Sequence, residues 1–127
     1  MHEPAFLSLE DIELLHDRAL QCYGGSAGTR DRNLLASAAH QPQNDYFYGG
    51  ADLCGIAAAY CYHLAEAQAY LDGNKRTAVA AALTFLAGNG VSIMFDSIQL
   101  YEAMIALAER RVGKQEIAEL LRELVQA

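Results

Sequence analysis

The spacing of apolar residues near the N-terminus predicts an amphipathic helix over residues 8–23. Its expected core-facing stripe repeats every three or four positions, at Ile12, Leu15, Ala19 and Cys22. Ser8 is a favourable N-cap, and two glycines stand at the expected end. The glycine-rich segment 24–30 is then predicted to be a helix stop and turn, because no strand precedes it and it lacks the spacing of a phosphate-binding loop.

A short helix and a loop are expected next. Asp31 can cap a second helix that should end near Ala39. Pro42, and a pair of glycines further on, predict a loop over residues 40–50. Three consecutive aromatic residues at 46–48 lie in this loop, where they either tuck into the core or form a contact surface. We favour the tucked arrangement.

Two segments without a polar face predict the centre of the fold. Residues 52–67 and 74–87 are apolar almost all round, which is typical of helices enclosed by other helices. The chain shows no internal repeat and no linker long enough to divide domains. We therefore predict an all-α fold: a single compact domain over residues 1–127, with about six helices around a buried central helix that begins near Asn74.

The C-terminal third completes the expected bundle. Residues 91–95 alternate weakly and predict a short extended piece, such as one arm of a hairpin. Asp96 or Ser97 can cap a further helix, whose expected stripe is Ile98, Tyr101, Ile105, Ala108 and Val112. Gly113 separates it from a last amphipathic helix that carries Ile117, Leu120, Leu121 and Leu124.

The amino-acid composition and the net charge exclude several classes of protein. Hydrophobic residues make up 53% of the 127 residues and charged residues 20%, which excludes a disordered chain. Nine basic against sixteen acidic residues give a net charge of −7, which argues against nucleic-acid binding. No apolar run reaches transmembrane length, and the N-terminus lacks the regions of a signal peptide, so we expect a cytoplasmic protein with no membrane partner.

The three cysteines predict neither a disulfide framework nor a zinc site. Cys54 and Cys61 lie on one expected helix, about 10 Å apart at a rise of ~1.5 Å per residue, which is beyond disulfide reach. No pair of cysteines or histidines has the spacing of zinc ligands. Buried free thiols are the favoured interpretation.

The turn between the two apolar helices is the one segment whose residues suggest chemistry. Gly73 lets the backbone approach a ligand, and the amides of Asn74, Lys75 and Arg76 open a helix whose N-terminus attracts phosphate. Lys75 and Arg76 add positive charge. Asp72 is a hard oxygen ligand suited to Mg²⁺ beside phosphates. An anion site and a simple capping turn with solvated side chains are both open on spacing alone.

Residues 68–78, Gln-Ala-Tyr-Leu-Asp-Gly-Asn-Lys-Arg-Thr-Ala, resemble the signature of the Fic/Doc (Fido) superfamily, specifically its death-on-curing branch. That signature runs His, variable, Phe, variable, Asp or Glu, Gly or Ala, Asn, Lys, Arg. Residues 14–17, 23–25 and 28–31 resemble the branch's N-terminal pattern, and residues 82–90 resemble its following helix. The resemblance therefore covers nearly the whole chain.

The resemblance implies an all-α toxin of a toxin–antitoxin pair. Doc-like proteins transfer the γ-phosphate of ATP onto elongation factor Tu, Fic proteins transfer a nucleotidyl group onto a protein hydroxyl, and a small antitoxin neutralises the toxin. The family's positions place Mg²⁺ on Asp72, an anion hole at Gly73 and Asn74, and phosphate contacts on Lys75 and Arg76. Asp72 and Arg76 are thus expected catalytic residues.

One position departs from the signature. Gln68 stands where the family has the histidine that acts as general base, and a glutamine amide takes no proton at neutral pH. Such a loss typically costs about 10²–10⁴-fold in rate, while positioning and charge stabilisation remain. Tyr70 replaces the phenylalanine and keeps an aromatic anchor. His63 is expected to face away from position 68, and His16 occupies a part of the pattern without a catalytic role.

Two functions stay open at this point. The chain is either a Doc-like transferase weakened at position 68 or a catalytically inactive Fic/Doc-fold module that binds nucleotide or an antitoxin without transfer. Whether Gln68 arose naturally or by engineering is a further open question. His2 and His40 are expected to be exposed and to take no part.

Overall fold

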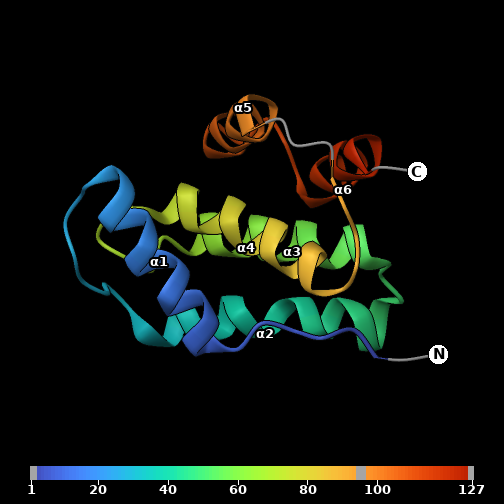
Figure 1. Ribbon diagram of the computed structural model, residues 1–127, viewed down its shortest axis with the longest axis horizontal. Helices are drawn as coiled ribbons and strands as arrows, with labels where there is room; N and C mark the ends of the chain where they lie inside the picture. Colours follow the sequence, from blue (N-terminus) through green and yellow to red (C-terminus); the bar gives the residue numbers. More distant parts are fainter. Residues whose placement is uncertain (1–2, 94–96, 126–127) are drawn as a thin grey trace.

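In the computed structural model, which describes residues 3–93 and 97–125, the helices lie in three layers (Figure 1). The described residues form six α-helices: α1 (Leu9–Tyr23), α2 (Arg32–Gly49), α3 (Leu53–Ala67), α4 (Asn74–Gly88), α5 (Ser97–Ala108) and α6 (Lys114–Leu124). Their β pairing is limited to two isolated bridges, Thr29 with Tyr70 and Ile93 with Val125. The predicted all-α class is confirmed.

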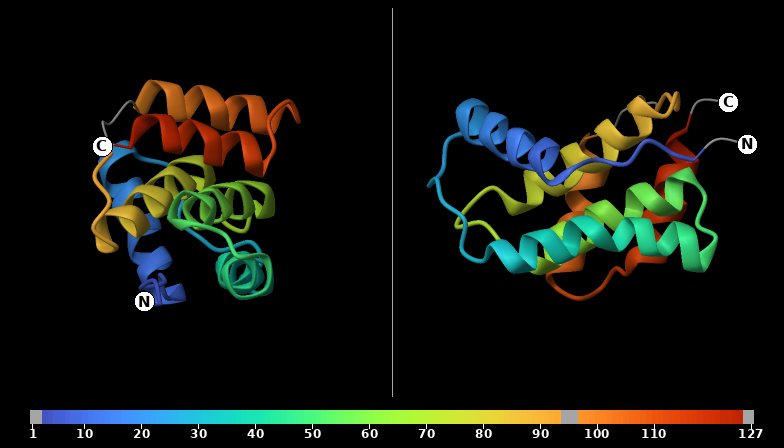
Figure 2. Two further views of the ribbon diagram at one scale, coloured as in Figure 1. Left: turned by 90° about the vertical axis from the view of Figure 1, so that its right-hand side faces the viewer. Right: turned by 90° about the horizontal axis from the view of Figure 1, so that it is seen from below.

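The two apolar helices form the middle layer, as predicted. α3 and α4 lie side by side, with α1 and α2 on one side of them and α5 and α6 on the other (Figure 2). α4 buries most of its length, including Ala78, Ala81, Ala82, Phe85 and Leu86. The turn between α3 and α4 lies at one end of this layer. Solvent can therefore reach the turn although both flanking helices are buried.

α1 confirms the predicted cap but buries a different set of residues. Ser8 Oγ accepts a hydrogen bond from the Asp11 amide (3.1 Å), and the Asp11 carboxylate accepts one from the Ser8 amide (2.9 Å). Ile12 is fully buried, whereas Cys22 is exposed, so the expectation of buried thiols holds for Cys54 and Cys61 alone. The fully buried side of α1 continues from Ile12 to His16.

The second helix is longer than predicted. Capped by Asp31, it runs through Pro42 to Gly49, where Gly50 ends it in the left-handed region (φ 67°). The prediction of a loop after residue 39 was wrong, because the proline ring is buried and the packing of the later turns outweighs the lost hydrogen bond. Tyr46 packs edge-on against Phe6, with ring centroids 5.9 Å apart.

The three aromatic residues at the end of α2 therefore differ in their burial. Tyr46 is half-buried, as the tucked arrangement predicted. Phe47 is 52% exposed and Tyr48 is 88% exposed, so the prediction was wrong for these two residues. Consecutive helical positions point about 100° apart, so three neighbouring residues cannot all face one core.

The predicted apolar stripe of α5 was also wrong. Its buried face is formed by Leu100, Met104 and Leu107, while Ile98 and Ile105 are 68% and 46% exposed. The helix is apolar on nearly every side, so two stripes with the same spacing were available and the spacing could not select one. α6 buries Ile117 and Leu121 as predicted. The candidate cap Asp96 and the end of the predicted extended piece lie outside the described residues.

Ile93, in the predicted extended piece, forms an isolated antiparallel bridge with Val125. The described residues show no hairpin at this point. Among the residues that the structure describes, no helix is long and apolar enough to cross a lipid bilayer.

Candidate functional site

The turn 68–73 leaves the N-terminus of α4 uncapped. Gly73 adopts the left-handed conformation (φ 79°) at the N-cap position and provides no side-chain hydrogen bond. The first bond within the helix runs from the Thr77 amide to the Gly73 carbonyl (3.0 Å). The amides of Asn74, Lys75 and Arg76 therefore have no acceptor among the described residues, and a helix N-terminus with free amides attracts anions.

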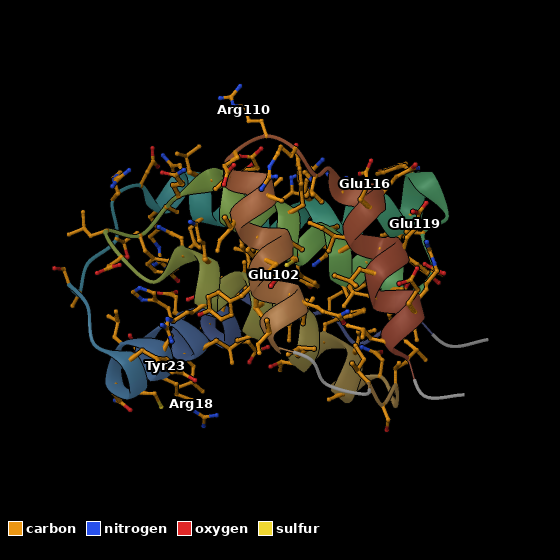
Figure 3. The ribbon with its side chains drawn as sticks, turned by 90° about the horizontal axis from the view of Figure 1, so that it is seen from above. Arg18, Tyr23, Glu102, Arg110, Glu116 and Glu119 are labelled. Carbon is orange, nitrogen blue, oxygen red and sulfur yellow. The ribbon has the colours of Figure 1, made fainter. Side chains whose placement is uncertain are left out.

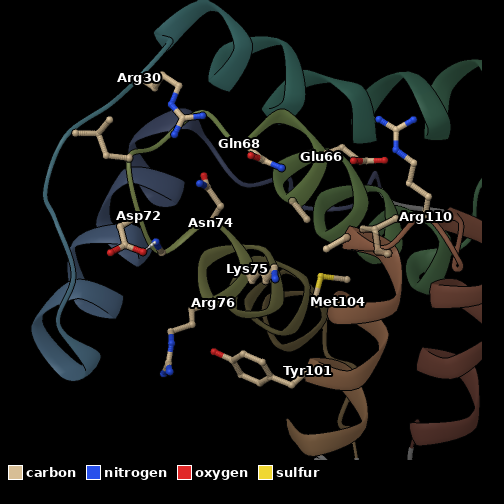
Figure 4. A pocket seen from close by; sticks show the side chains of 15 residues that line it. Arg30, Glu66, Gln68, Asp72, Asn74, Lys75, Arg76, Tyr101, Met104 and Arg110 are labelled. Atoms are coloured by element: carbon tan, nitrogen blue, oxygen red, sulfur yellow. Dashed lines mark hydrogen bonds between the residues drawn. The ribbon is translucent and has the colours of Figure 1, made fainter.

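These amides lie beside a cavity of about 550 Å³ (Figure 4). The turn and α4 form one wall, α5 and Arg110 form the opposite wall, and the end of α3 forms the third. All six predicted site residues line this cavity: Gln68, Asp72, Gly73, Asn74, Lys75 and Arg76. The sequence prediction thus identified residues that the fold brings together.

The glycine-rich segment after α1 is part of the site. The Leu71 amide donates to the Gly28 carbonyl (3.0 Å), and the Arg30 amide donates to the Ala69 carbonyl (2.6 Å). Arg30 also lines the cavity. The expectation of a simple turn was therefore incomplete, because this segment pairs with the turn between α3 and α4 and fixes its position.

Asp72 is oriented by two amides. Its Oδ1 accepts a hydrogen bond from the Gly73 amide (2.9 Å), and its Oδ2 accepts one from the Ser26 amide (3.2 Å). Each carboxylate oxygen keeps a further lone pair for a ligand. Since Mg²⁺ is commonly held by one or two carboxylates together with substrate phosphates, this single carboxylate beside the free amides of α4 fits that ion. The described residues contain no cluster of three metal-ligating side chains.

Gly25 leaves room for this carboxylate. A Cβ at Gly25 would lie 2.8 Å from Asp72 Oδ2. We expect Gly25→Ala to displace the carboxylate. If the site binds ATP with Mg²⁺, as the family resemblance implies, the substitution should lower this affinity about tenfold, as measured by calorimetry. Gly24→Ala is the matched control, because Gly24 also has a positive φ but nothing lies within 4 Å of its added Cβ. Equal affinities in the two variants would contradict the expected role of Gly25.

The side chain of Asn74 is engaged within the protein. Its Oδ1 accepts a hydrogen bond from the Tyr70 amide (3.1 Å), and its Nδ2 donates to the Tyr70 carbonyl (2.9 Å). The expected contribution of Asn74 to an anion hole is therefore limited to its backbone amide. The side chain instead closes the turn that presents this amide.

Arg76 is held between two aromatic rings. Its guanidinium carbon lies 3.7 Å from the centroid of the Tyr23 ring and 5.5 Å from that of Tyr101. Lys75, in contrast, is exposed. Figure 4 shows the two basic side chains on different sides of the α4 N-terminus, so they can contact different parts of one ligand.

Gln68 lies at the end of α3 in an unusual conformation. It occupies the C-cap position with φ 46°, in the left-handed region that favours glycine. Its amide is exposed and lines the same cavity as Asp72. The position predicted for the general base is thus inside the site, but the side chain there cannot accept a proton.

His16 is the site residue that the sequence did not reveal. Its Nε2 lies 2.8 Å from the Asp72 carbonyl oxygen, and its ring stacks on Tyr70 with centroids 3.5 Å apart and planes 5° apart. A carbonyl oxygen only accepts, so Nε2 carries the proton and donates. His16 is therefore a positioning residue for the turn. The signals in the sequence were its place four residues after Ile12, on the buried face of α1, and its place within residues 14–17 of the family's N-terminal pattern.

We expect His16→Phe to keep the stacking on Tyr70 but to leave the Asp72 carbonyl without its donor. The predicted loss in the free energy of unfolding is about 1–3 kcal/mol, measured by urea denaturation, together with weaker ATP binding. His40→Phe is the matched control, because His40 is exposed on α2. If both variants unfold at the parental urea concentration, the positioning role is refuted.

The hydroxyl of Tyr70 is buried and has no hydrogen-bond partner among the described residues. Burial raises the pKa of Tyr70 to about 12, so the phenol stays protonated at neutral pH. Tyr70 thus serves as the aromatic anchor predicted from the signature, stacked against His16.

His63 lies outside the site, as expected. Its Nε2 is 3.1 Å from the Lys114 ammonium, which also pairs with Asp45 at 2.7 Å. Burial, aided by the Lys114 charge, lowers the pKa of His63 to about 4. His63 does not line the cavity, and its contacts join α2, α3 and α6. His40 is exposed, and His2 lies outside the described residues.

Comparison with known proteins places this geometry in a family. The sequence pattern of the Fic/DOC family matches residues 6–86, which include the turn, the glycine-rich segment and His16. The chain belongs to the Fic/DOC family. The match ends at residue 86, before α5. The cavity wall formed by α5 and Arg110 therefore lies outside the matched segment.

Two Doc proteins are similar to this Fic/DOC chain over most of its length. Protein kinase doc of Escherichia phage P1 is 33% identical over 119 residues, which cover 93% of this chain and 94% of the relative. Toxin Doc of Mycolicibacterium smegmatis is 40% identical over 102 residues, which cover 76% of this chain and 77% of the relative. The resemblance to the death-on-curing branch is confirmed.

Proposed function

We propose that this protein is a Doc-like toxin that transfers a phosphoryl or nucleotidyl group from ATP onto a hydroxyl of a protein. The observation that carries the proposal is the uncapped N-terminus of α4, where three free amides, two basic side chains and Asp72 face one cavity. The similarity to a protein named a kinase supports the same chemistry. Elongation factor Tu is the first candidate acceptor, in the cytoplasm, and a small antitoxin is the expected partner.

Each residue has a role in this proposal. The amides of Asn74, Lys75 and Arg76 hold phosphate oxygens, and the Arg76 guanidinium adds a planar, two-pronged contact. Asp72 would hold Mg²⁺, and the bound ion would supply positive charge beside the phosphates. His16 and the Asn74 side chain keep the turn in place. Positioning and charge stabilisation of this kind supply most of the catalysis of phosphoryl transfer.

The proton of the accepting hydroxyl has no acceptor at position 68. We therefore propose that the unmodified chain transfers slowly. Because the anion site is intact, the second candidate function is a module that binds nucleotide or an antitoxin without transfer. Gln68 is the observation that favours this alternative.

The test uses the purified chain, Mg²⁺, elongation factor Tu and ATP labelled at either the α or the γ phosphorus. Label that reaches the acceptor from the γ position only indicates phosphoryl transfer, and label from the α position indicates nucleotidyl transfer. ATP binding without transfer of either label, by this chain and by Gln68→His alike, would support the binding module and refute the transferase.

A further inference from the structure

Arg110 combines two unusual properties at the rim of the cavity. Among the described residues, Gln68 and Arg110 are the two non-glycine residues with positive φ (46° and 62°), and both line the cavity. Gln68 holds the family's catalytic position. Arg110 lies beyond the segment matched by the family pattern, which ends at residue 86, so nothing so far gives it a role.

The backbone at Arg110 is a helix end at which glycine is favoured. The Arg110 amide donates to the Leu107 carbonyl and the Arg111 amide donates to the Ala106 carbonyl, both at 2.7 Å. This pair of bonds defines a helix end whose left-handed residue is usually glycine. A large side chain held in that conformation is destabilising by itself, and such residues gather at functional sites.

Arg110 is also distinguished by the lack of a carboxylate partner for its charge among the described residues. Of the nine lysines and arginines, four pair with carboxylates: Arg32, Arg111, Lys114 and Arg122. The remaining five have no carboxylate partner in the described part of the chain, and four of them line this one cavity: Arg30, Lys75, Arg76 and Arg110. Two carboxylates, Glu66 and Asp72, line the cavity as well, so its lining has a net charge of +2 (four positive minus two negative side chains). In a chain of net charge −7, this net positive lining favours the approach of an acidic ligand.

The position of Arg110 favours a ligand larger than a nucleotide. Figure 4 places Asp72 and Arg76 on one side of the cavity and Arg110 on the other. Figure 3 shows the Arg110 side chain extending from the turn after α5 away from the body of the protein. Phosphates at the α4 N-terminus would be matched by the free amides, Lys75 and Arg76 without Arg110. The exposed Arg110 side chain lies at the opposite rim of the cavity, where a macromolecule that covers the cavity mouth would contact it.

We propose that Arg110 binds a carboxylate of the acceptor protein, next to the hydroxyl that receives the transferred group. This inference rests on the proposed function, since it assumes a protein acceptor at the cavity. Charge complementarity supports a carboxylate as the contact, because the lining of this cavity is net positive although the chain as a whole is acidic.

The experiment measures steady-state transfer to elongation factor Tu in the Gln68→His background. We expect Arg110→Gly to raise KM for the acceptor about tenfold or more while KM for ATP stays within about twofold. Arg110→Lys should lie in between. Arg111→Gly is the matched control, because Arg111 is the neighbouring exposed arginine and pairs with Glu109. Added salt should raise the acceptor KM of the Arg110 protein more than that of Arg110→Gly.

The midpoint of thermal unfolding distinguishes a role of Arg110 in acceptor binding from a role in the stability of the fold. Glycine suits the left-handed conformation, so Arg110→Gly should keep or raise the midpoint of thermal unfolding. An unchanged acceptor KM, a rise confined to the KM for ATP, or a lower unfolding midpoint would each overturn the inference while the proposed function stands. Absence of any transfer by the Gln68→His parent would overturn the proposed function and this inference with it.

Discussion

Gln68→His is expected to raise the rate of transfer from ATP to the acceptor by about 10²–10⁴-fold, the usual contribution of a positioned general base. The side chain at position 68 is exposed and lines the cavity that contains Asp72 and the α4 N-terminus. The substitution therefore adds a proton acceptor to a site whose free amides and basic side chains are already in place. The rate is measured with labelled ATP and elongation factor Tu.

Gln68→Asn provides the control for this result. It keeps a neutral amide at the position and should leave the slow rate unchanged, since neither amide takes a proton. In cells, Gln68→His should arrest growth where the parental chain does not. Equal rates in the parental and Gln68→His proteins, at a clearly measurable level, would show that another group accepts the proton.

Arg76→Ala is expected to weaken binding of ATP with Mg²⁺ by about 1.5–3 kcal/mol, or roughly 10–150-fold, because a charged, two-pronged phosphate contact is lost. The stacking on Tyr23 and the nearby Tyr101 ring hold the guanidinium at the edge of the cavity. Its side chain therefore loses little freedom when a phosphate binds. Calorimetric titration of ATP measures the effect.

Arg18→Ala is the matched control for this variant, since Arg18 is an exposed arginine of α1 that does not line the cavity. It should bind ATP with parental affinity. If Arg76→Ala also binds ATP as the parent does, the α4 N-terminus is not the phosphate site.

The sequence predicted the central helices and the site between them because both depend on local properties. A helix that is apolar all round must be enclosed, and free amides at its start attract anions whatever surrounds it. The choice between two apolar stripes on α5 and the continuation of α2 through Pro42 depend on packing against distant segments. Such partners are not visible in a stretch of sequence.

His16 shows the same limit at the site. Its hydrogen bond reaches the carbonyl of a residue 56 positions away. A main-chain acceptor leaves no trace in side-chain identity, so the family pattern that includes His16 did not indicate this contact. Arg110 is similar, because its proposed role comes from a backbone conformation and from the lack of a carboxylate partner among the described residues, and neither can be read from residue type.

The wall formed by α5 supplies the last parts of the cavity to be synthesised. A chain emerges from the ribosome N-terminus first, so α1, the turn and α4 can associate while Tyr101, Met104 and Arg110 are still being added. Until then the cavity is open on one side, and Arg76 lacks its Tyr101 neighbour. A nascent chain therefore contains all of residues 68–76 well before the cavity beside them has its last wall.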